Sequence, residues 1–269
     1  MDNGNHKIIF LTSSPDASYQ VDGRWITGPF TSKNGFLGQV RDVWQSPSRV
    51  LVITATPDEY EKNDEMIRYF EKVFAASGLP AACIRLLDRR TEEQLAEWLS
   101  DSDFVVLGGG HVPTQNAFFK QIGLREQMEQ FSGVIMGISA GTMNCADLVY
   151  AQPELAGEAV DPSYEKFITG LGLTQRNVLP HYQMVKDNML DGMRLMEEIT
   201  YGDSAGHAFY ALEDGSYIRC EDGEETLYGN AYLIKDGTIS MICRDNESRK
   251  LAHDHRTKAK KETAEWMQK

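Results

Sequence analysis

A serine at the apex of a glycine-flanked turn is the first group in this sequence that could do covalent chemistry. Ser139 follows an apolar run at residues 134–136 and lies between Gly137 and Gly141. A strand that turns sharply into a helix with serine at its apex is a nucleophile elbow, in which a strained backbone exposes the hydroxyl. A side chain at either glycine would collide with the neighbouring strand and helix. The pattern predicts a nucleophilic Ser139 followed by a helix over residues 142–150; the alternative is a glycine-rich turn without chemistry.

A nucleophilic serine needs a base within hydrogen-bond reach and an acid that orients the base. The best base is His181, because it follows a strand predicted over residues 175–179, and functional side chains gather at the carboxyl ends of parallel strands. Pro180 fixes the backbone direction before it. His111 follows a glycine triplet and could also lie near the site, although a helix-capping or substrate-loop role is the simpler interpretation. The other histidines lie in presumed termini or beside a strand: His6, His253, His255 and His207.

The acid is expected at the next strand end. Glu213 and Asp214 follow a predicted strand over residues 207–212 and precede Gly215. Either carboxylate could orient His181. The alternative is an ordinary Glu-Asp-Gly surface turn.

The glycine triplet at residues 108–110 could complete such a site. Placed between a strand and a helix, a backbone N–H of Gly109 or Gly110 could join the N–H of Ala140 in a two-donor oxyanion hole. A phosphate-binding loop is the rival interpretation. Against it, no Lys-Ser/Thr pair follows, and Pro113 rules out a G-x-G-x-x-G pattern.

The elements that would position these groups alternate between strand and helix. Strands are predicted over residues 7–12, 49–54, 81–87, 104–107 and 134–136, and helices over residues 58–77, from 91, and over 113–128. This order predicts a parallel sheet with right-handed crossovers, that is, a doubly wound α/β domain. Residues 13–47 are expected to form a long loop with a short helix near residues 36–44.

The pattern loosens after residue 151. An acidic loop is expected at residues 152–161, a helix over residues 187–200, and further strands over residues 216–220, 231–234 and 238–243. Residues 244–269 are predicted to form a polar tail or a surface helix. Because composition does not shift along the chain, we expect residues 1–269 to form a single α/β domain.

Composition limits the classes of partner. The net charge of −13 argues against nucleic-acid or anionic-membrane binding, which require clustered Lys and Arg. An acidic substrate would need a local basic pocket. The four cysteines are widely spaced, so neither a disulfide framework nor a metal site is expected. With no apolar run long enough for a membrane span and no signal-like N-terminus, a cytoplasmic location is expected. The oligomeric state does not follow from the sequence.

Four segments together resemble a known family. FVVLGGG at residues 104–110, MGISAGTMN at 136–144, LPHY at 179–182 and ALEDGSYI at 211–218 are similar, in that order, to the alpha-aspartyl dipeptidase (peptidase E) and cyanophycinase family of serine peptidases. The resemblance covers roughly residues 50–234. Its order of Ser, His and acid differs from the Ser, acid, His order of α/β-hydrolases.

The resemblance implies a flavodoxin-like, mostly parallel sheet similar to class I glutamine amidotransferases. It implies that Ser139 is the nucleophile and His181 the base, with Gly109 or Gly110 in the oxyanion loop. Aligning the Gly-Ser that follows the acidic pair implies Asp214 as the acid. The family mostly has Glu at that position, which leaves Glu213 as the alternative. Residues 13–47 and 152–170 have no clear family counterpart and could reshape the substrate pocket.

The function expected from these features is a serine peptidase that hydrolyses dipeptides or short peptides without metal or organic cofactor. The family's best-known members cleave after aspartate, which requires a cation in the pocket. Arg125, Arg176 and Lys186 are candidates, although solvated surface charge is the simpler interpretation of each. An esterase or amidase acting on a non-peptide, or a catalytically silent binding module, are the alternatives. Cys145 is expected to be a packing residue.

Overall fold

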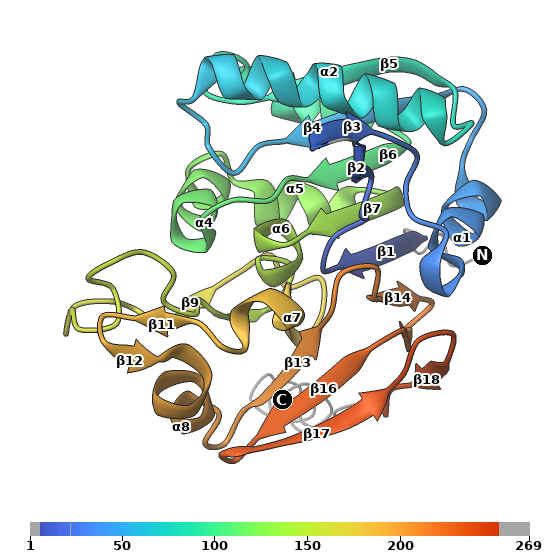
Figure 1. Ribbon diagram of the computed structural model, residues 1–269. Helices are drawn as coiled ribbons and strands as arrows, with labels where there is room; N and C mark the ends of the chain where they lie inside the picture. The colour runs from blue at the N-terminus through green and yellow to red at the C-terminus, as the bar shows by residue number, and fades with distance from the viewer. Residues whose placement is uncertain (1–5, 22, 253–269) are drawn as a thin grey trace, which may run out of the picture.

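The computed structural model of the chain describes residues 6–21 and 23–252 (Figure 1). Its largest sheet has eight strands in the order β18-β15-β14-β1-β7-β6-β4-β5. The strands are β1 (Lys7–Thr12), β4 (Ser48–Ile53), β5 (Ala81–Leu87), β6 (Phe104–Leu107), β7 (Gly133–Ile138), β14 (Tyr217–Glu221), β15 (Glu224–Tyr228) and β18 (Ser248–Lys250). The five strands from β1 to β5 in this order are parallel, and the other three are antiparallel.

Helices cover both faces of the parallel half. On β1, Ile9 and Leu11 pack in one apolar layer, whereas Ile8 and Phe10 pack in the opposite one. The first layer includes buried residues of α3 (Leu95–Ser100), α4 (Val112–Gln121) and α5 (Leu124–Gln130), and the second those of α1 (Phe36–Val43) and α2 (Tyr60–Ala76). Because side chains alternate along a strand, burial on both sides requires the continuous apolar runs seen in these strands. The predicted doubly wound, flavodoxin-like fold is confirmed.

A second, four-stranded sheet, in the order β10-β13-β16-β17, lies below the parallel strands of the first in Figure 1. It contains β10 (Asn177–Leu179), β13 (Ala208–Leu212), β16 (Ala231–Lys235) and β17 (Thr238–Cys243). β10 and β13 are parallel, so their carboxyl ends lie at the same edge. All four strands were expected, but the sequence did not indicate that they form a sheet of their own.

The helix predicted over residues 142–150 is wrong beyond its first turn. α6 (Ala140–Met143) is followed by a short strand, β8 (Leu148–Tyr150), which pairs with β9 (Phe167–Thr169). Between α6 and β8, the carbonyl of Cys145 accepts hydrogen bonds from the N–H groups of Leu173 and Thr174. The backbone thus bonds to a segment distant in sequence instead of to its own next turn, and tertiary pairing overrides local propensity.

The helix predicted over residues 187–200 is also largely wrong. Strands β11 (Met189–Leu190) and β12 (Met193–Arg194) form a hairpin. A π-helical turn (Leu195–Thr200) and the short α8 (Tyr201–Asp203) follow it. The two turn residues, Asp191 and Gly192, both have positive φ, at 51° and 83°. An Asp-Gly pair favours such a hairpin turn, so the sequence carried a signal for it.

Smaller differences lie elsewhere. The helix predicted over residues 113–128 is two helices, because Gly123, at φ 63°, interrupts it between α4 and α5. The loop at residues 13–47 contains the expected short helix α1 and also a hairpin of β2 (Ser18–Val21) and β3 (Arg24–Thr27).

In the predicted polar tail, residues 248–250 form the sheet strand β18, whereas residues 253–269, with His253 and His255, lie outside the described part. Strand β15 was not predicted. In the described part of the chain, no helix combines the length and apolar character needed to cross a membrane.

Candidate active site

Ser139 occupies the sharp turn between β7 and α6, with φ 53° and ψ −114°. Few non-glycine residues adopt a positive φ, and such strain is held only where the surroundings fix it. Here the Ser139 N–H donates to the carbonyls of Thr12 and Ser13, each at 3.2 Å. A Cβ added at Gly141 would lie 2.1 Å from the Leu107 carbonyl oxygen. The geometry is that of a nucleophile elbow.

The glycine loop that follows β6 runs beside this serine. A Cβ built on Gly109 would lie 3.4 Å from the Ser139 Cβ, and one built on Gly110 would lie 2.6 Å from the Ala55 Cβ. Gly110 has φ 156°. The Gly109 backbone therefore lies beside the serine, and a side chain at Gly110 would collide with Ala55. This placement suits a loop that offers N–H groups to an oxyanion.

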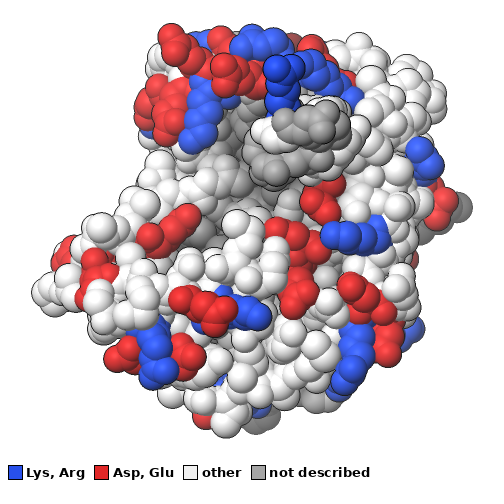
Figure 2. Space-filling view, viewed as in Figure 1, with Lys and Arg blue, Asp and Glu red and all other residues white. Residues whose placement is uncertain are grey.

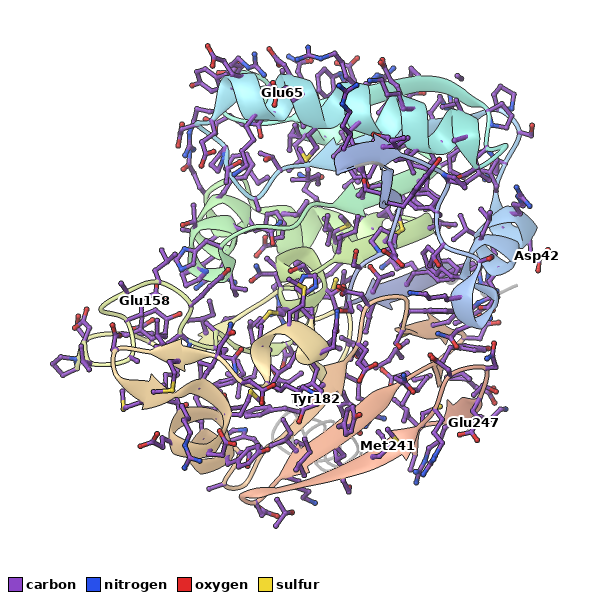
Figure 3. All side chains as sticks on the ribbon, viewed as in Figure 1. Asp42, Glu65, Glu158, Tyr182, Met241 and Glu247 are labelled. Atoms are coloured by element: carbon purple, nitrogen blue, oxygen red, sulfur yellow. The ribbon has the colours of Figure 1, made fainter. Side chains whose placement is uncertain are left out.

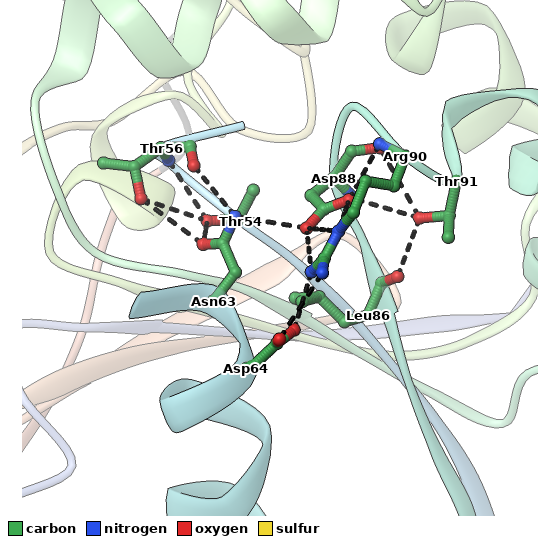
Figure 4. A network of polar contacts seen from close by, with 8 residues as sticks. All are labelled: Thr54, Thr56, Asn63, Asp64, Leu86, Asp88, Arg90 and Thr91. Atoms are coloured by element: carbon green, nitrogen blue, oxygen red, sulfur yellow. Dashed lines mark hydrogen bonds and ion pairs between the residues drawn. The ribbon is translucent and has the colours of Figure 1, made fainter. Parts of the chain in front are cut away.

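A buried polar network braces the turn against which Gly110 packs (Figure 4). The Thr54 hydroxyl donates to Asn63 at 2.7 Å, and the Asn63 amide donates to the Thr56 carbonyl at 2.9 Å and to Asp88 at 3.3 Å. Arg90 pairs with the fully buried Asp88 at 2.6 Å. Because every member has a partner, the network holds the end of β4 in one arrangement.

His181 and Asp214 meet at the adjoining edge of the second sheet. His181 follows β10 and has a left-handed backbone, φ 57°. Its Nδ1 lies 2.7 Å from Asp214 Oδ1. Ser13 lies between the two residues, since its hydroxyl accepts a hydrogen bond from the His181 backbone N–H and donates one to Asp214, each at 2.7 Å. These contacts fix the plane of the imidazole.

Asp214 is held in its ionised form. Burial pushes its pKa upward, but the hydrogen bond and charge of His181, with hydrogen bonds from Ser13 and Gln183, outweigh burial and place the pKa below its ordinary 3.8. The Gln183 amide donates to the second carboxylate oxygen at 2.7 Å. The carboxylate of Glu213 instead accepts hydrogen bonds from Asn230 and Tyr232.

A cavity of about 190 Å³ joins the two halves of the site. Ser139, Ala140, Gly110 and His181 all line it. The loop between β8 and β9 and the β11–β12 hairpin complete its wall, and Figure 3 shows this loop, which carries Glu158, opposite α7 (Tyr182–Val185). The molecule is hollowed on this face, with Asp and Glu side chains beside the hollow (Figure 2).

The other histidines among the described residues do not join this arrangement. His111 is bonded through one ring nitrogen to Thr114 and through the other to Glu158, each at 2.8 Å, so it ties the glycine loop to the β8–β9 loop. His207, just before β13, stacks on Phe167 of β9. His6 lies beside Asp222.

Three further sequence candidates have structural partners or lie at the surface. Arg125 is paired with Asp147, and Arg176 is bonded to Glu225 and Tyr210. Lys186 is exposed, and none of these three cations lines the cavity.

The Cys145 thiol is fully buried, and burial raises its pKa to about 12, which fits packing. In the described part of the chain, no cluster of three or more His, Cys, Asp or Glu could hold a metal ion.

Comparison with known proteins assigns the family. Residues 33–228 match the family model for Peptidase family S51. The chain belongs to this family. As an S51 member the protein is a serine peptidase, a hydrolase, and its resemblance to peptidase E is confirmed. No curated protein matches the sequence.

Solved structures agree with the S51 assignment at the level of fold. A peptidase from an acI-B1 Actinobacterium has a TM-score of 0.61 and 14% identity, and the alignment covers 92% of this chain and 98% of that one. A putative peptidase E protein from Listeria monocytogenes EGD-e has a TM-score of 0.55 and 16% identity, with 88% and 99% covered. At such identities the likeness shows a shared fold alone.

Sequence reasoning missed Ser13, Gln183 and Glu154, all of which lie at the site. Ser13 follows β1 in a Thr-Ser-Ser-Pro stretch and is 168 positions from His181, its hydrogen-bond partner. The signal available was its place at the carboxyl end of a parallel strand next to the one that carries Ser139.

Proposed function

We propose that this S51 peptidase hydrolyses short peptides through Ser139, His181 and Asp214. The observation that carries the proposal is the 2.7 Å contact between His181 Nδ1 and Asp214, beside a cavity that Ser139 also lines. With Nδ1 bonded to a carboxylate, Nε2 is the ring nitrogen free to take a proton from a nucleophile.

The reaction follows from these positions. Ser139 Oγ attacks the scissile carbonyl carbon, and its proton passes to His181 Nε2. The oxyanion is stabilised by backbone N–H groups of Ala140 and of Gly109 or Gly110. His181 then protonates the leaving amine, which departs with its C–N bond broken, and leaves an acyl-enzyme. Water, activated by the same imidazole, hydrolyses the ester and restores Ser139.

The size of the cavity favours dipeptides or other short peptides. At about 190 Å³ it is smaller than the roughly 300 Å³ at which small-molecule sites begin. The contact between His111 and Glu158 holds the β8–β9 loop against the glycine loop. We infer that this loop restricts the length of peptide that can reach Ser139.

The test compares wild type with Ser139→Ala on a dipeptide and tripeptide library. We expect Ser139→Ala to lose turnover by a factor of about 10³ or more while its thermal unfolding is unchanged. A fluorophosphonate probe should label wild type at Ser139 alone. Hydrolysis that persists in Ser139→Ala, or preferred cleavage of p-nitrophenyl esters with no peptide turnover, would contradict the proposal.

A further inference from the structure

The charge of the residues that line the cavity is the starting point. Among the described residues of its wall there is no Lys or Arg, whereas Glu154 is present. The rest of the wall is largely apolar, with Val112, Leu190 and Leu195 among its members. An aspartyl side chain would need a cation here, and the wall presents a carboxylate instead.

The position of Glu154 places its charge close to the reacting groups. Its own backbone N–H donates to Glu158 at 2.8 Å, which fixes the start of the β8–β9 loop. Within residues 6–21 and 23–252 its carboxyl has no hydrogen-bond partner. Glu154 lines the same cavity as Ser139 and His181, and the charges of His111 and His181 act on its carboxyl.

The surroundings make an unpaired carboxylate costly. Glu154 as a whole is exposed, but partial burial of its carboxyl raises the pKa of that group. The charges of His111 and His181 lower this pKa, and the charge of Glu158 raises it. A cation bound next to Glu154 would relieve this cost and gain a charge-assisted hydrogen bond. The net charge of −13 also favours the approach of cations over anions.

We propose that Glu154 binds a positively charged group of the substrate residue whose carbonyl Ser139 attacks, and that the site discriminates against aspartate there. The inference rests on the proposed function for its reacting centre. The cation is either the free α-ammonium of a peptide N-terminus or the side chain of Lys or Arg. Both offer the same N–H donors to a carboxylate, and the experiment separates them.

The first measurement is binding, which does not depend on turnover. Dipeptide amides are titrated calorimetrically into Ser139→Ala: Leu-Ala with a free α-amine, acetyl-Lys-Ala with a charged side chain only, uncharged acetyl-Leu-Ala, and Asp-Ala. We expect at least one of the first two to bind roughly tenfold or more tightly than acetyl-Leu-Ala, and Asp-Ala to bind more weakly than Leu-Ala. Adding Glu154→Gln should remove the preference for the cationic ligand.

The matched control is Glu65→Gln in the same background. Glu65 is exposed on α2 (Figure 3), so this variant has the same change in net charge as Glu154→Gln and leaves the cavity intact. It should keep the wild-type ligand preference. A loss in Glu154→Gln confined to Leu-Ala assigns the α-ammonium, and one confined to acetyl-Lys-Ala assigns the side chain.

Three results would overturn the proposal: equal affinities across the four ligands, tighter binding of Asp-Ala than of Leu-Ala, or an unchanged preference in Glu154→Gln. Turnover by the enzyme with Ser139 intact is measured separately on the same peptides. A failure there contradicts the proposed function, whereas the binding series alone decides the role of Glu154.

Discussion

Ser13→Ala tests whether the contacts around His181 position it for catalysis. Ser13 is fully buried, and its hydroxyl makes two hydrogen bonds of 2.7 Å, one to the Asp214 carboxylate and one from the His181 backbone N–H. A hydrogen bond to a charged group contributes roughly 1.5–3 kcal/mol and a neutral one about 1 kcal/mol. We therefore expect Ser13→Ala to lower the free energy of unfolding by about 3 kcal/mol.

Part of this loss should appear in the rate. Without Ser13 the left-handed backbone at His181 loses its anchor, and Asp214 keeps only His181 and Gln183 as side-chain donors. If half of the 3 kcal/mol is expressed in the transition state, kcat falls about tenfold, because roughly 1.4 kcal/mol corresponds to a factor of ten. KM should change little, since Ser13 does not line the cavity.

The assay combines steady-state kinetics with thermal unfolding. For a domain of this size 1 kcal/mol shifts Tm by roughly 2–4 °C, so a decrease of about 6–12 °C is expected. Ser14→Ala is the control, because the neighbouring hydroxyl only accepts a bond from Asp16 N–H in an exposed turn. If kcat of Ser13→Ala stays within twofold of wild type, or if KM rises while kcat is unchanged, the positioning role is refuted.

The other predictions concern the acid and the elbow. Asp214→Asn should lower kcat by roughly 10³- to 10⁴-fold, whereas Glu213→Gln should alter kcat by only a few-fold. Because the folded pKa of Asp214 lies below 3.8, its contribution to stability is present above that pH and is lost as pH falls through the lowered pKa. The free energies of unfolding of wild type and Asp214→Asn, measured with urea, should therefore differ by a constant amount above about pH 5 and converge as pH falls below about 4. A difference that grows on acidification would contradict this sign. Gly141→Ala should abolish cooperative unfolding, because its Cβ would lie 2.1 Å from the Leu107 oxygen, while Gly38→Ala in α1, with no atom within 4 Å, should fold normally in the same circular-dichroism melt.

The parallel half of the fold was predictable because burial on both faces leaves a direct mark on sequence. β4 and β6 are short runs rich in Val, Ile and Leu, bounded by polar residues and glycine, and their predicted bounds agree with the structure to within a residue. The sharp turn at Ser139 was predictable for a related reason. The strained turn requires glycine at both flanking positions. A Cβ would lie 2.7 Å from the nearest atom at Gly137 and 2.1 Å from it at Gly141.

Features that depend on long-range pairing were not predictable in this way. Residues 144–150 carry no glycine or proline to end a helix, yet the segment bonds to residues 167–174. In the β11–β12 hairpin the apolar residues also fit a helical period, so the period outweighed the Asp191-Gly192 turn signal. The bond between Ser13 and His181 depends on how the two sheets are joined, which no local pattern encodes.

The junction of the two sheets explains why the site needs both halves of the fold. β1 pairs in parallel with β7, which leads into Ser139, and in antiparallel fashion with β14, which follows the turn that carries Asp214. The Ser13 N–H bonds to the Ser216 carbonyl at 3.2 Å and so extends the second pairing past the end of β1. β13 leads into the same turn. β10 runs parallel to β13, so His181, which follows β10, lies next to Asp214. Ser13 therefore links the two sheets at His181, so a displacement of either sheet would move the imidazole. Because Ser13 does not line the cavity, its hydroxyl is expected to affect kcat and not KM.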